Sequence, residues 1–355
     1  MKRYHIVLLT VLIGLAVLLS SCVPGPRVTG SPGITLSEEM VYVAYSNFVY
    51  GLNIEDGAVK WHYPDERSNK IVFYAPPLYE DDQIYVGDLA NNFYKLDAAN
   101  GNVEWTFSDA KGFYIGQAEK DDGMIFAPSN DGTLYVLNDD GDLLWQYETG
   151  HYIWAQPQVS SDAVYVASMD HFVYALTKDG EEIWAKELSG AVVSSPVLSD
   201  DESALFVGTM GKEMVSLDTK NGDILWSFDA GGGLDSVWAQ AVLLDGMLIF
   251  ADSSGQLYAL DSNTGEPEWQ NDTSSSVVGG LAAIEDGFVL STQDGLVKAY
   301  SADGTPGWEA TLVGELYQAP VVYNETLVAG SIDGENLVYG FNLSGVQLWS
   351  TTPEN

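Results

Sequence analysis

A short phrase that ends in tryptophan recurs eight times along the chain. Residues 96–105, "LDAANGNVEW", give its form: apolar residues, a polar turn that contains glycine, and an indole. The copies lie 39 to 44 residues apart and end at Trp61, Trp105, Trp145, Trp184, Trp226, Trp269, Trp308 and Trp349. A period of about 40 residues is typical of propellers and other repeat folds. One repeated unit therefore accounts for nearly the whole chain.

Each period contains four segments that favour short strands. Apolar and polar residues alternate in segments such as residues 256–260, and Asp-Gly and Asn-Gly pairs between the segments suit tight hairpin turns. A four-stranded sheet of this size cannot bury both faces alone, so the units must pack face to face around an axis, which also protects most strand edges. The sequence predicts an all-β fold, an eight-bladed β-propeller of four-stranded antiparallel blades, over residues 34–355.

The eight repeated tryptophans are predicted to be structural. Each indole would bury a large apolar area against the neighbouring blade, near the outer strand and beside the glycine turn. The closure of the ring stays open at this point, because residues 34–36 could form the inner strand of the first blade or part of a shared closing blade. Seven blades with an additional hairpin are the alternative.

The first 22 residues have the features of an export signal. Two basic residues, Lys2 and Arg3, precede an apolar run over residues 6–19 and then Ser-Ser-Cys. Because this ending resembles the bacterial lipobox, we expect residues 1–21 to be a lipoprotein signal peptide and Cys22 to be lipidated. Residues 22–33, rich in Pro and Gly, then form a tether. An uncleaved membrane anchor and an ordinary secretory signal are the alternatives.

The predicted location is therefore extracytoplasmic, with the chain attached by lipid to a membrane at the cell surface or on its periplasmic face. Cys22 is the only cysteine, so the chain can form no internal disulfide. Without Lys2 and Arg3, 12 basic residues stand against 51 acidic ones, a net charge of −39. This charge makes nucleic acid and anionic lipid poor partners. We expect a monomeric body that meets the membrane only through its lipid.

The sequence contains no convincing catalytic or metal-binding motif. Three histidines, His62, His151 and His171, remain after processing, with no His-Glu-x-x-His and no Gly-x-Ser-x-Gly pattern. Asp-rich turns such as residues 129–132 lack the ligand spacing of a calcium loop. No metal site and no catalytic residue are predicted.

A second repeated phrase stands where each innermost strand begins, as in "FYAPP" and "IWAQP". Aromatic residues occur there in the second, fourth, sixth and eighth repeats, whereas Val193 and Val278 occur in the fifth and seventh. Innermost strands line the axial channel, so these rings should gather with nearby amides at one of its mouths. The predicted channel-mouth residues are Tyr74, Tyr114, Trp154, Gln156, Trp238, Gln240, Tyr317 and Gln318, with Gln117 beside them. Such a surface suits a peptide, a sugar or a partner loop. The alternative is that the large side chains merely plug the channel.

The pattern "LDxxxGxxxW" after "YVG…LYAL" resembles the tryptophan-docking repeat of the pyrroloquinoline quinone (PQQ) family of propellers, over about residues 33–350. This family includes quinoprotein dehydrogenases and BamB, a lipoprotein of the outer-membrane assembly machinery. The resemblance implies the fold more strongly than the function.

Resemblance to the dehydrogenases would imply PQQ, Ca²⁺, an arginine near the quinone oxygens and a ring formed by two adjacent cysteines. This chain has no Cys-Cys pair, and only Arg27 and Arg67 remain after processing. We therefore expect no cofactor and a non-catalytic scaffold that binds envelope or surface proteins, or a peptide or glycan ligand, with a BamB-like role in envelope protein assembly. A PQQ- and Ca²⁺-dependent oxidoreductase and a sugar- or peptide-binding sensor are the alternatives.

Overall fold

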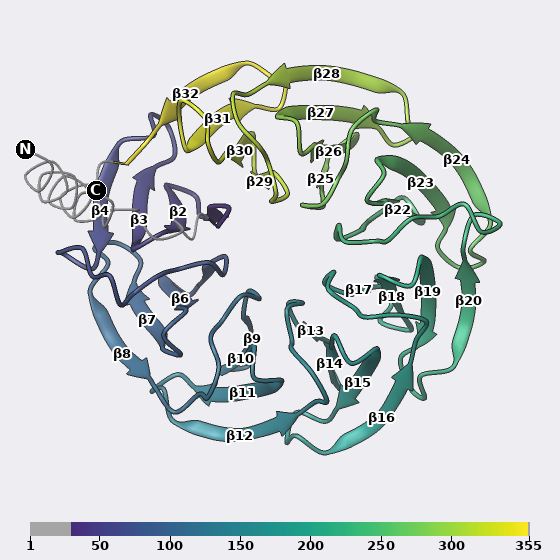
Figure 1. Ribbon diagram of the computed structural model, residues 1–355, viewed down its shortest axis with the longest axis horizontal. Helices are drawn as coiled ribbons and strands as arrows, with labels where there is room; N and C mark the ends of the chain where they lie inside the picture. Colours follow the sequence, from purple (N-terminus) through teal and green to yellow (C-terminus); the bar gives the residue numbers. More distant parts are fainter. Residues whose placement is uncertain (1–29, 354–355) are drawn as a thin grey trace, which may run out of the picture.

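The protein folds as a ring of eight antiparallel four-stranded sheets (Figure 1). A computed structural model describes residues 30–353, and the predicted signal peptide, Cys22 and most of the predicted tether lie outside this range. Within residues 30–353, no helix has the length and apolar character needed to span a membrane. The predicted all-β, eight-bladed propeller is confirmed.

Each blade is built from four consecutive strands that run from the axis outward. Blade 1 has β1 (Gly33–Leu36), β2 (Met40–Tyr45), β3 (Phe48–Asn53) and β4 (Val59–Tyr63), and blade 2 has β5 (Leu78–Glu80), β6 (Gln83–Gly87), β7 (Phe93–Asp97) and β8 (Val103–Phe107). Blade 3 has β9 (Glu119–Asp121), β10 (Met124–Pro128), β11 (Thr133–Asn138) and β12 (Leu143–Glu148), and blade 4 has β13 (Gln158–Val159), β14 (Val164–Ala167), β15 (Phe172–Leu176) and β16 (Glu182–Glu187).

The second half of the ring repeats this plan. Blade 5 has β17 (Val197–Leu198), β18 (Ala204–Thr209), β19 (Glu213–Asp218) and β20 (Ile224–Phe228), and blade 6 has β21 (Val242–Leu244), β22 (Met247–Ala251), β23 (Gln256–Asp261) and β24 (Pro267–Asp272). Blade 7 has β25 (Leu281–Ile284), β26 (Gly287–Ser291), β27 (Leu296–Ser301) and β28 (Pro306–Thr311), and blade 8 has β29 (Val321–Tyr323), β30 (Thr326–Gly330), β31 (Val338–Asn342) and β32 (Gln347–Thr351).

The repeated tryptophans join each blade to the next. Every indole Nε1 donates a hydrogen bond, 2.8 to 3.0 Å long, to a main-chain carbonyl in the turn between the third and fourth strands of the following blade. The pairs are Trp61 with Ala98, Trp105 with Asp139, Trp145 with Lys178, Trp184 with Thr219, Trp226 with Ser262, Trp269 with Ala302, Trp308 with Leu343, and Trp349 with Ile54.

A glycine in the same turn lies against each indole. Gly101 has φ +74°, and a Cβ added there would lie 2.4 Å from Cε3 of Trp61. Both the positive φ and the close ring favour a residue without a side chain. The glycine turn and the tryptophan in the repeated phrase therefore meet in space, across the joint between successive blades.

The ring closes by packing between blades 8 and 1, without a shared strand. β1 pairs with β2, so residues 34–36 belong to the inner strand of the first blade, which begins one residue earlier than predicted. Trp349 donates to the carbonyl of Ile54, 295 residues away, at 2.8 Å. Leu36 and Val328 share one apolar cluster across this seam. The alternatives of seven blades and of a shared closing blade are therefore wrong.

Aspartates order the loops between the second and third strands of several blades. Asp88 is fully buried and accepts hydrogen bonds from the Tyr94 hydroxyl and from the main-chain N–H groups of Ala90 and Asn92, each at 2.8 Å. Asp131 and Asp170 accept a tyrosine hydroxyl in the same way. These loops lie on the side of the ring where the inner strands begin, which we call the mouth face. They support the site described next.

Candidate functional site

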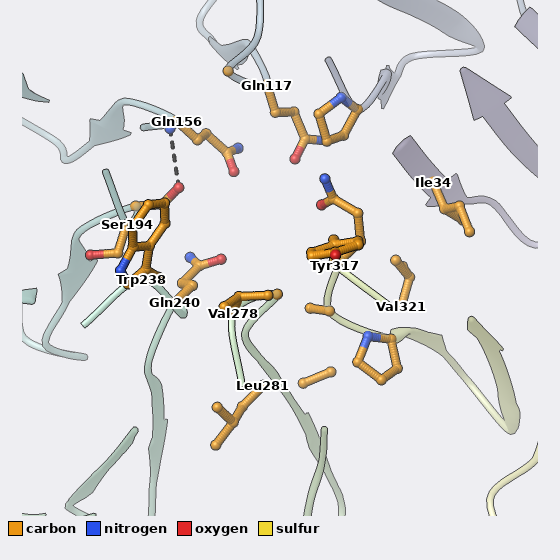
Figure 2. Close-up of a pocket in the computed structure, with 18 of the residues that line it drawn as sticks. Ile34, Gln117, Gln156, Ser194, Trp238, Gln240, Val278, Leu281, Tyr317 and Val321 are labelled. Carbon is orange, nitrogen blue, oxygen red and sulfur yellow. Dashed lines mark hydrogen bonds between the residues drawn. The ribbon is translucent and has the colours of Figure 1, made fainter. Parts of the chain in front are cut away.

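A hollow of about 520 Å³ opens on the axis of the ring, and residues of all eight blades line it. Most lining residues come from the segments that precede the inner strands, so the hollow opens on the mouth face. Figure 2 shows side chains of several blades around this space. Its volume lies in the range of pockets that hold small ligands.

Aromatic and aliphatic side chains alternate around the hollow at one equivalent position per blade. From blade 2 to blade 8 this position holds Tyr74, Ile115, Trp154, Val193, Trp238, Val278 and Tyr317, all of which line the hollow. Rings thus stand on the even-numbered blades and smaller side chains between them. The smaller neighbours leave space between the rings, which is why the axis stays open at this end.

The prediction that Tyr114 lies at the mouth is wrong. Its side chain is fully buried, with its ring 5.2 Å from that of Phe93, and Ile115 lines the hollow instead. Adjacent residues of an extended segment point to opposite sides, and Tyr114 is equivalent to the buried Ile153 rather than to Trp154. Burial raises the pKa of the Tyr114 hydroxyl well above its usual value. This hydroxyl has no hydrogen-bond partner among the described residues.

The rings at the mouth differ in how they are held. The Trp154 Nε1 donates to Asn130 Oδ1 at 2.7 Å, from a loop of blade 3. The Tyr317 hydroxyl donates to Glu315 Oε2 at 2.5 Å, and this bond raises the pKa of Tyr317. Trp238 is 39% exposed, and no residue in the range 30–353 accepts a hydrogen bond from its Nε1. Trp238 is therefore the most available large ring of the mouth.

The four glutamines also fall into two kinds. Gln117 Nε2 donates to a main-chain carbonyl of the preceding blade at 2.9 Å, and Gln156 Nε2 donates to Glu119 Oε2 at 2.6 Å. The side-chain amides of Gln240 and Gln318 make no hydrogen bond to any other residue of the described range, although both line the hollow. Two amides are therefore tied to the wall and two face the space with open donors and acceptors.

Glu119 is a residue that the sequence analysis missed. It begins β9 beside the hollow, and burial raises the pKa of its carboxyl group even though the Gln156 amide stabilises the charged form. An acidic residue within "QAEKDDG" resembles the many exposed acids of this chain. Only its hydrogen bond with Gln156 of the next blade distinguishes Glu119 from those acids.

No charged residue of the range 30–353 lines the hollow, although the whole chain contains 51 acidic and 14 basic residues. A quinone cofactor with three carboxylates needs cationic partners, and Arg67, the only arginine of residues 30–353, instead donates from Nε to Asn47 Oδ1 at 2.9 Å. Residues 30–353 contain no group of three or more His, Cys, Asp or Glu side chains arranged to hold a metal ion. The lining therefore does not fit PQQ with Ca²⁺.

Acidic side chains concentrate on the opposite face of the ring. The hairpins between the first and second strands lie there and carry runs such as residues 80–82, 200–202 and 285–286. The described residues that line the hollow are thus uncharged, while the carboxylates of Glu119 and Glu315 lie beside it and accept hydrogen bonds from Gln156 and Tyr317.

Several curated proteins and solved structures are similar to this chain. Outer membrane protein assembly factor BamB of Nitrosomonas eutropha is 31% identical over 107 residues, which are 30% of this chain and 26% of that protein. The same factor of Shewanella oneidensis is 30% identical over 148 residues, 40% of this chain and 35% of that protein. The chain thus spans only about a quarter to a third of these curated relatives.

Solved structures are similar over a greater length. The crystal structure of BamB from Moraxella catarrhalis has a TM-score of 0.72 and 20% identity, and covers 87% of this chain and 93% of that one. The computationally designed Ika8 protein has a TM-score of 0.77 and 15% identity, and covers 88% of this chain and 96% of that one. At these identities the likeness shows a shared fold.

The match to a family is the most extensive. A family model described as outer membrane protein assembly factor BamB matches residues 68–154, 130–279 and 254–355. Its description is that of an assembly factor and not of an enzyme, in agreement with the non-catalytic expectation. Since these matches overlap and together cover residues 68–355 without a gap, the protein belongs to the BamB family of PQQ-like β-propellers.

Proposed function

We propose that this protein is a lipid-anchored, non-catalytic scaffold of the cell envelope that holds a segment of a partner protein in its axial mouth during envelope protein assembly. The single observation that carries this proposal is the open hollow lined by aromatic rings and amides. Aromatic side chains with adaptable hydrogen-bonding groups are characteristic of protein-binding surfaces. The assembly role named in the family description supports the choice of a protein partner.

The polar groups of the hollow support binding rather than catalysis. Its two serines are engaged in the structure: Ser194 Oγ donates to the Gly208 carbonyl at 3.1 Å, and Ser195 Oγ accepts from the Gln156 N–H at 3.1 Å. Among the described residues, no histidine or carboxylate lines the hollow, so neither hydroxyl has a lining base to activate it. The described lining therefore lacks the general base that nucleophilic or acid–base catalysis requires.

The anchor is tested separately from the mouth. With Cys22 lipidated, the wild-type protein should incorporate a radiolabelled fatty acid in cells and sediment with membranes. Cys22→Ser should abolish both. A Cys22→Ser protein that still carries the label would refute lipidation at this residue.

The mouth is tested by crosslinking and pull-down from the native envelope. We expect the double variant Trp154→Ala/Trp238→Ala to lose the partner that the wild type captures. Tyr323→Ala is the matched control, because Tyr323 is 38% exposed but does not line the hollow. Far-UV circular dichroism of all three proteins establishes that the propeller is intact. Unchanged capture by the double variant would leave the rings as a plug of the channel and refute the proposal.

A further inference from the structure

The chemistry of the hollow restricts what can occupy it. A charged group that enters a cavity loses part of its hydration, and it regains stability only from a counter-charge or from several hydrogen bonds. Among residues 30–353, no side chain that lines the hollow carries a charge, and the carboxylates of Glu119 and Glu315 beside it already accept hydrogen bonds from Gln156 and Tyr317. The acids on the opposite face lie at the far ends of the strands and cannot contact a ligand at the mouth. The occupant is therefore uncharged where it enters the hollow.

The open polar groups lie on one side of the hollow. Gln240 precedes β21 in blade 6, Gln318 precedes β29 in blade 8, and Val278 stands between them from blade 7. Figure 2 shows Gln240, Val278 and Tyr317 on the side away from Gln117 and Gln156. This side thus combines two unpaired amides with the exposed ring of Trp238.

An amide side chain presents one acceptor and two donors in a plane, which match the C=O and N–H groups of a peptide main chain. The blade between the two glutamines holds its main chain close to them, since a Cβ added to Gly279 would lie 2.3 Å from the carbonyl carbon of Gln318. Val278, Gly279 and Gly280 put no polar side chain between the two amides. The gap is therefore apolar, with hydrogen-bonding groups at both ends.

We propose that the blade 6 to blade 8 side of the hollow binds the main chain of an uncharged loop of a partner protein, with Gln240 and Gln318 as the hydrogen-bonding residues and Trp238 as the apolar contact. This inference rests on the proposed function and adds the chemistry of the segment. A loop tip fits better than a long strand, because eight blades enclose the hollow and its 520 Å³ admits only a few residues.

The probe is a phage-displayed library of cyclic heptapeptides, selected on the purified full-length lipoprotein in detergent. We expect enriched loops to lack Asp, Glu, Lys and Arg at their central positions. Fluorescence anisotropy with a synthesised loop should then give at least about 10-fold weaker binding for Gln240→Ala/Gln318→Ala, since two hydrogen bonds are lost. Val278→Asp should abolish binding, whereas Val278→Leu should retain most of it.

The matched control is Gln146→Ala, which removes an exposed amide of the outer strand β12 that does not line the hollow, and it should change affinity less than about 3-fold. Enriched loops with central charges, equal binding by the Gln240→Ala/Gln318→Ala protein, or no enrichment over the Val278→Asp protein would each overturn the inference. A neutral oligosaccharide such as maltohexaose is tested in parallel. Its binding at Trp238 in place of the loops would show that the ligand class is wrong.

The chain's own tether is the remaining occupant to exclude. The chain enters blade 1 at the mouth face, where Gly30 lies so close to the Tyr74 ring that an added Cβ would be 2.3 Å from Cδ2. If loops bind only to a variant in which Gly and Ser replace residues 23–29, the tether fills the hollow and the inference is wrong.

Two results separate this inference from the proposed function. In the first, the wild type captures an envelope protein that the Trp154→Ala/Trp238→Ala variant does not, while the selected loops carry central charges. This result refutes the inference and supports the proposed function. Binding of neutral loops without any captured envelope protein supports the inference and refutes the function.

Discussion

Removal of the indole N–H at the seam of the ring tests how the propeller is held together. Trp349 is 7% exposed, and its Nε1 lies 2.8 Å from the Ile54 carbonyl of blade 1. Trp349→Phe keeps most of the apolar contact but leaves that carbonyl without its donor, which costs about 1 to 3 kcal/mol. Trp349→Ala also opens a cavity, and it should lower the free energy of unfolding by about 3 to 5 kcal/mol in total.

The matched variant lies at a joint inside the chain. Trp226 is 8% exposed and donates to the Ser262 carbonyl at 2.9 Å, so Trp226→Phe removes the same kind of bond between two covalently connected blades. Because no strand bridges the seam, both joints depend on the same contacts. We expect the two Trp→Phe variants to lose the same free energy of unfolding to within about 1 kcal/mol.

Urea unfolding followed by far-UV circular dichroism measures these differences without depending on tryptophan fluorescence. Trp238→Phe is the negative control and should change the free energy of unfolding by less than about 0.5 kcal/mol, since this ring is 39% exposed and joins no blades. A Trp349→Phe protein as stable as the wild type, beside a clearly destabilised Trp226→Phe protein, would refute the account of ring closure.

Substitutions at three further residues, Gly101, Asp88 and Glu119, test individual parts of the fold. Gly101→Ala should destabilise the protein by about 1 to 3 kcal/mol more than Gly246→Ala in urea unfolding, because both glycines have positive φ but only the former meets an indole. Asp88→Ala should lower the free energy of unfolding by about 3 kcal/mol in the same assay, since several buried donors lose their acceptor, and Asp88→Asn should lower it less. Glu119→Gln should be more stable than wild type at pH 7.5 but not at pH 4.5, as measured by the midpoints of urea unfolding at the two values.

The sign of the Glu119 prediction follows from the direction of its shift. Burial raises the pKa of this carboxyl above the ordinary value of 4.5, so the native state keeps the proton to higher pH than the unfolded chain. The free energy of unfolding of the wild type therefore falls as the pH rises from about 4.5 through the raised pKa. A difference between wild type and variant that does not change with pH would contradict this assignment. If Gly101→Ala and Gly246→Ala lowered the free energy of unfolding equally, the prediction for Gly101 would be wrong. An Asp88→Ala protein as stable as the wild type would contradict the prediction for Asp88.

The repeat was enough to predict the ring, because the spacing of glycine and tryptophan encodes a contact between neighbouring blades. Each indole needs a turn without a side chain, and both residues stand in the same phrase, so eight phrases give eight joints. The closure could not be derived in this way. Whether residues 34–36 pair within blade 1 depends on contacts between the two ends of the ring, which no local pattern contains.

The candidate site was predicted in kind but not in full detail. The misplacement of Tyr114 came from a register error of one residue, because "YIGQA" puts its ring where Phe73 and Ile153 stand in the neighbouring repeats. Alignment on the following Ala or Pro would have put Ile115 at the mouth. The division of the glutamines into tied and open amides depends on contacts between blades and has no signature in the sequence.

The seam between blades 8 and 1 has a consequence for the order of the blades. Since Trp349 meets Ile54 as every other indole meets the next blade, and no strand is exchanged, the described chain could start at any of the eight joints and build the same ring. A circularly permuted gene, with residue 353 linked to Gly33 and new ends placed between β16 and β17, should keep every docked indole. Which blade comes first is thus a matter of genetic history and not of architecture.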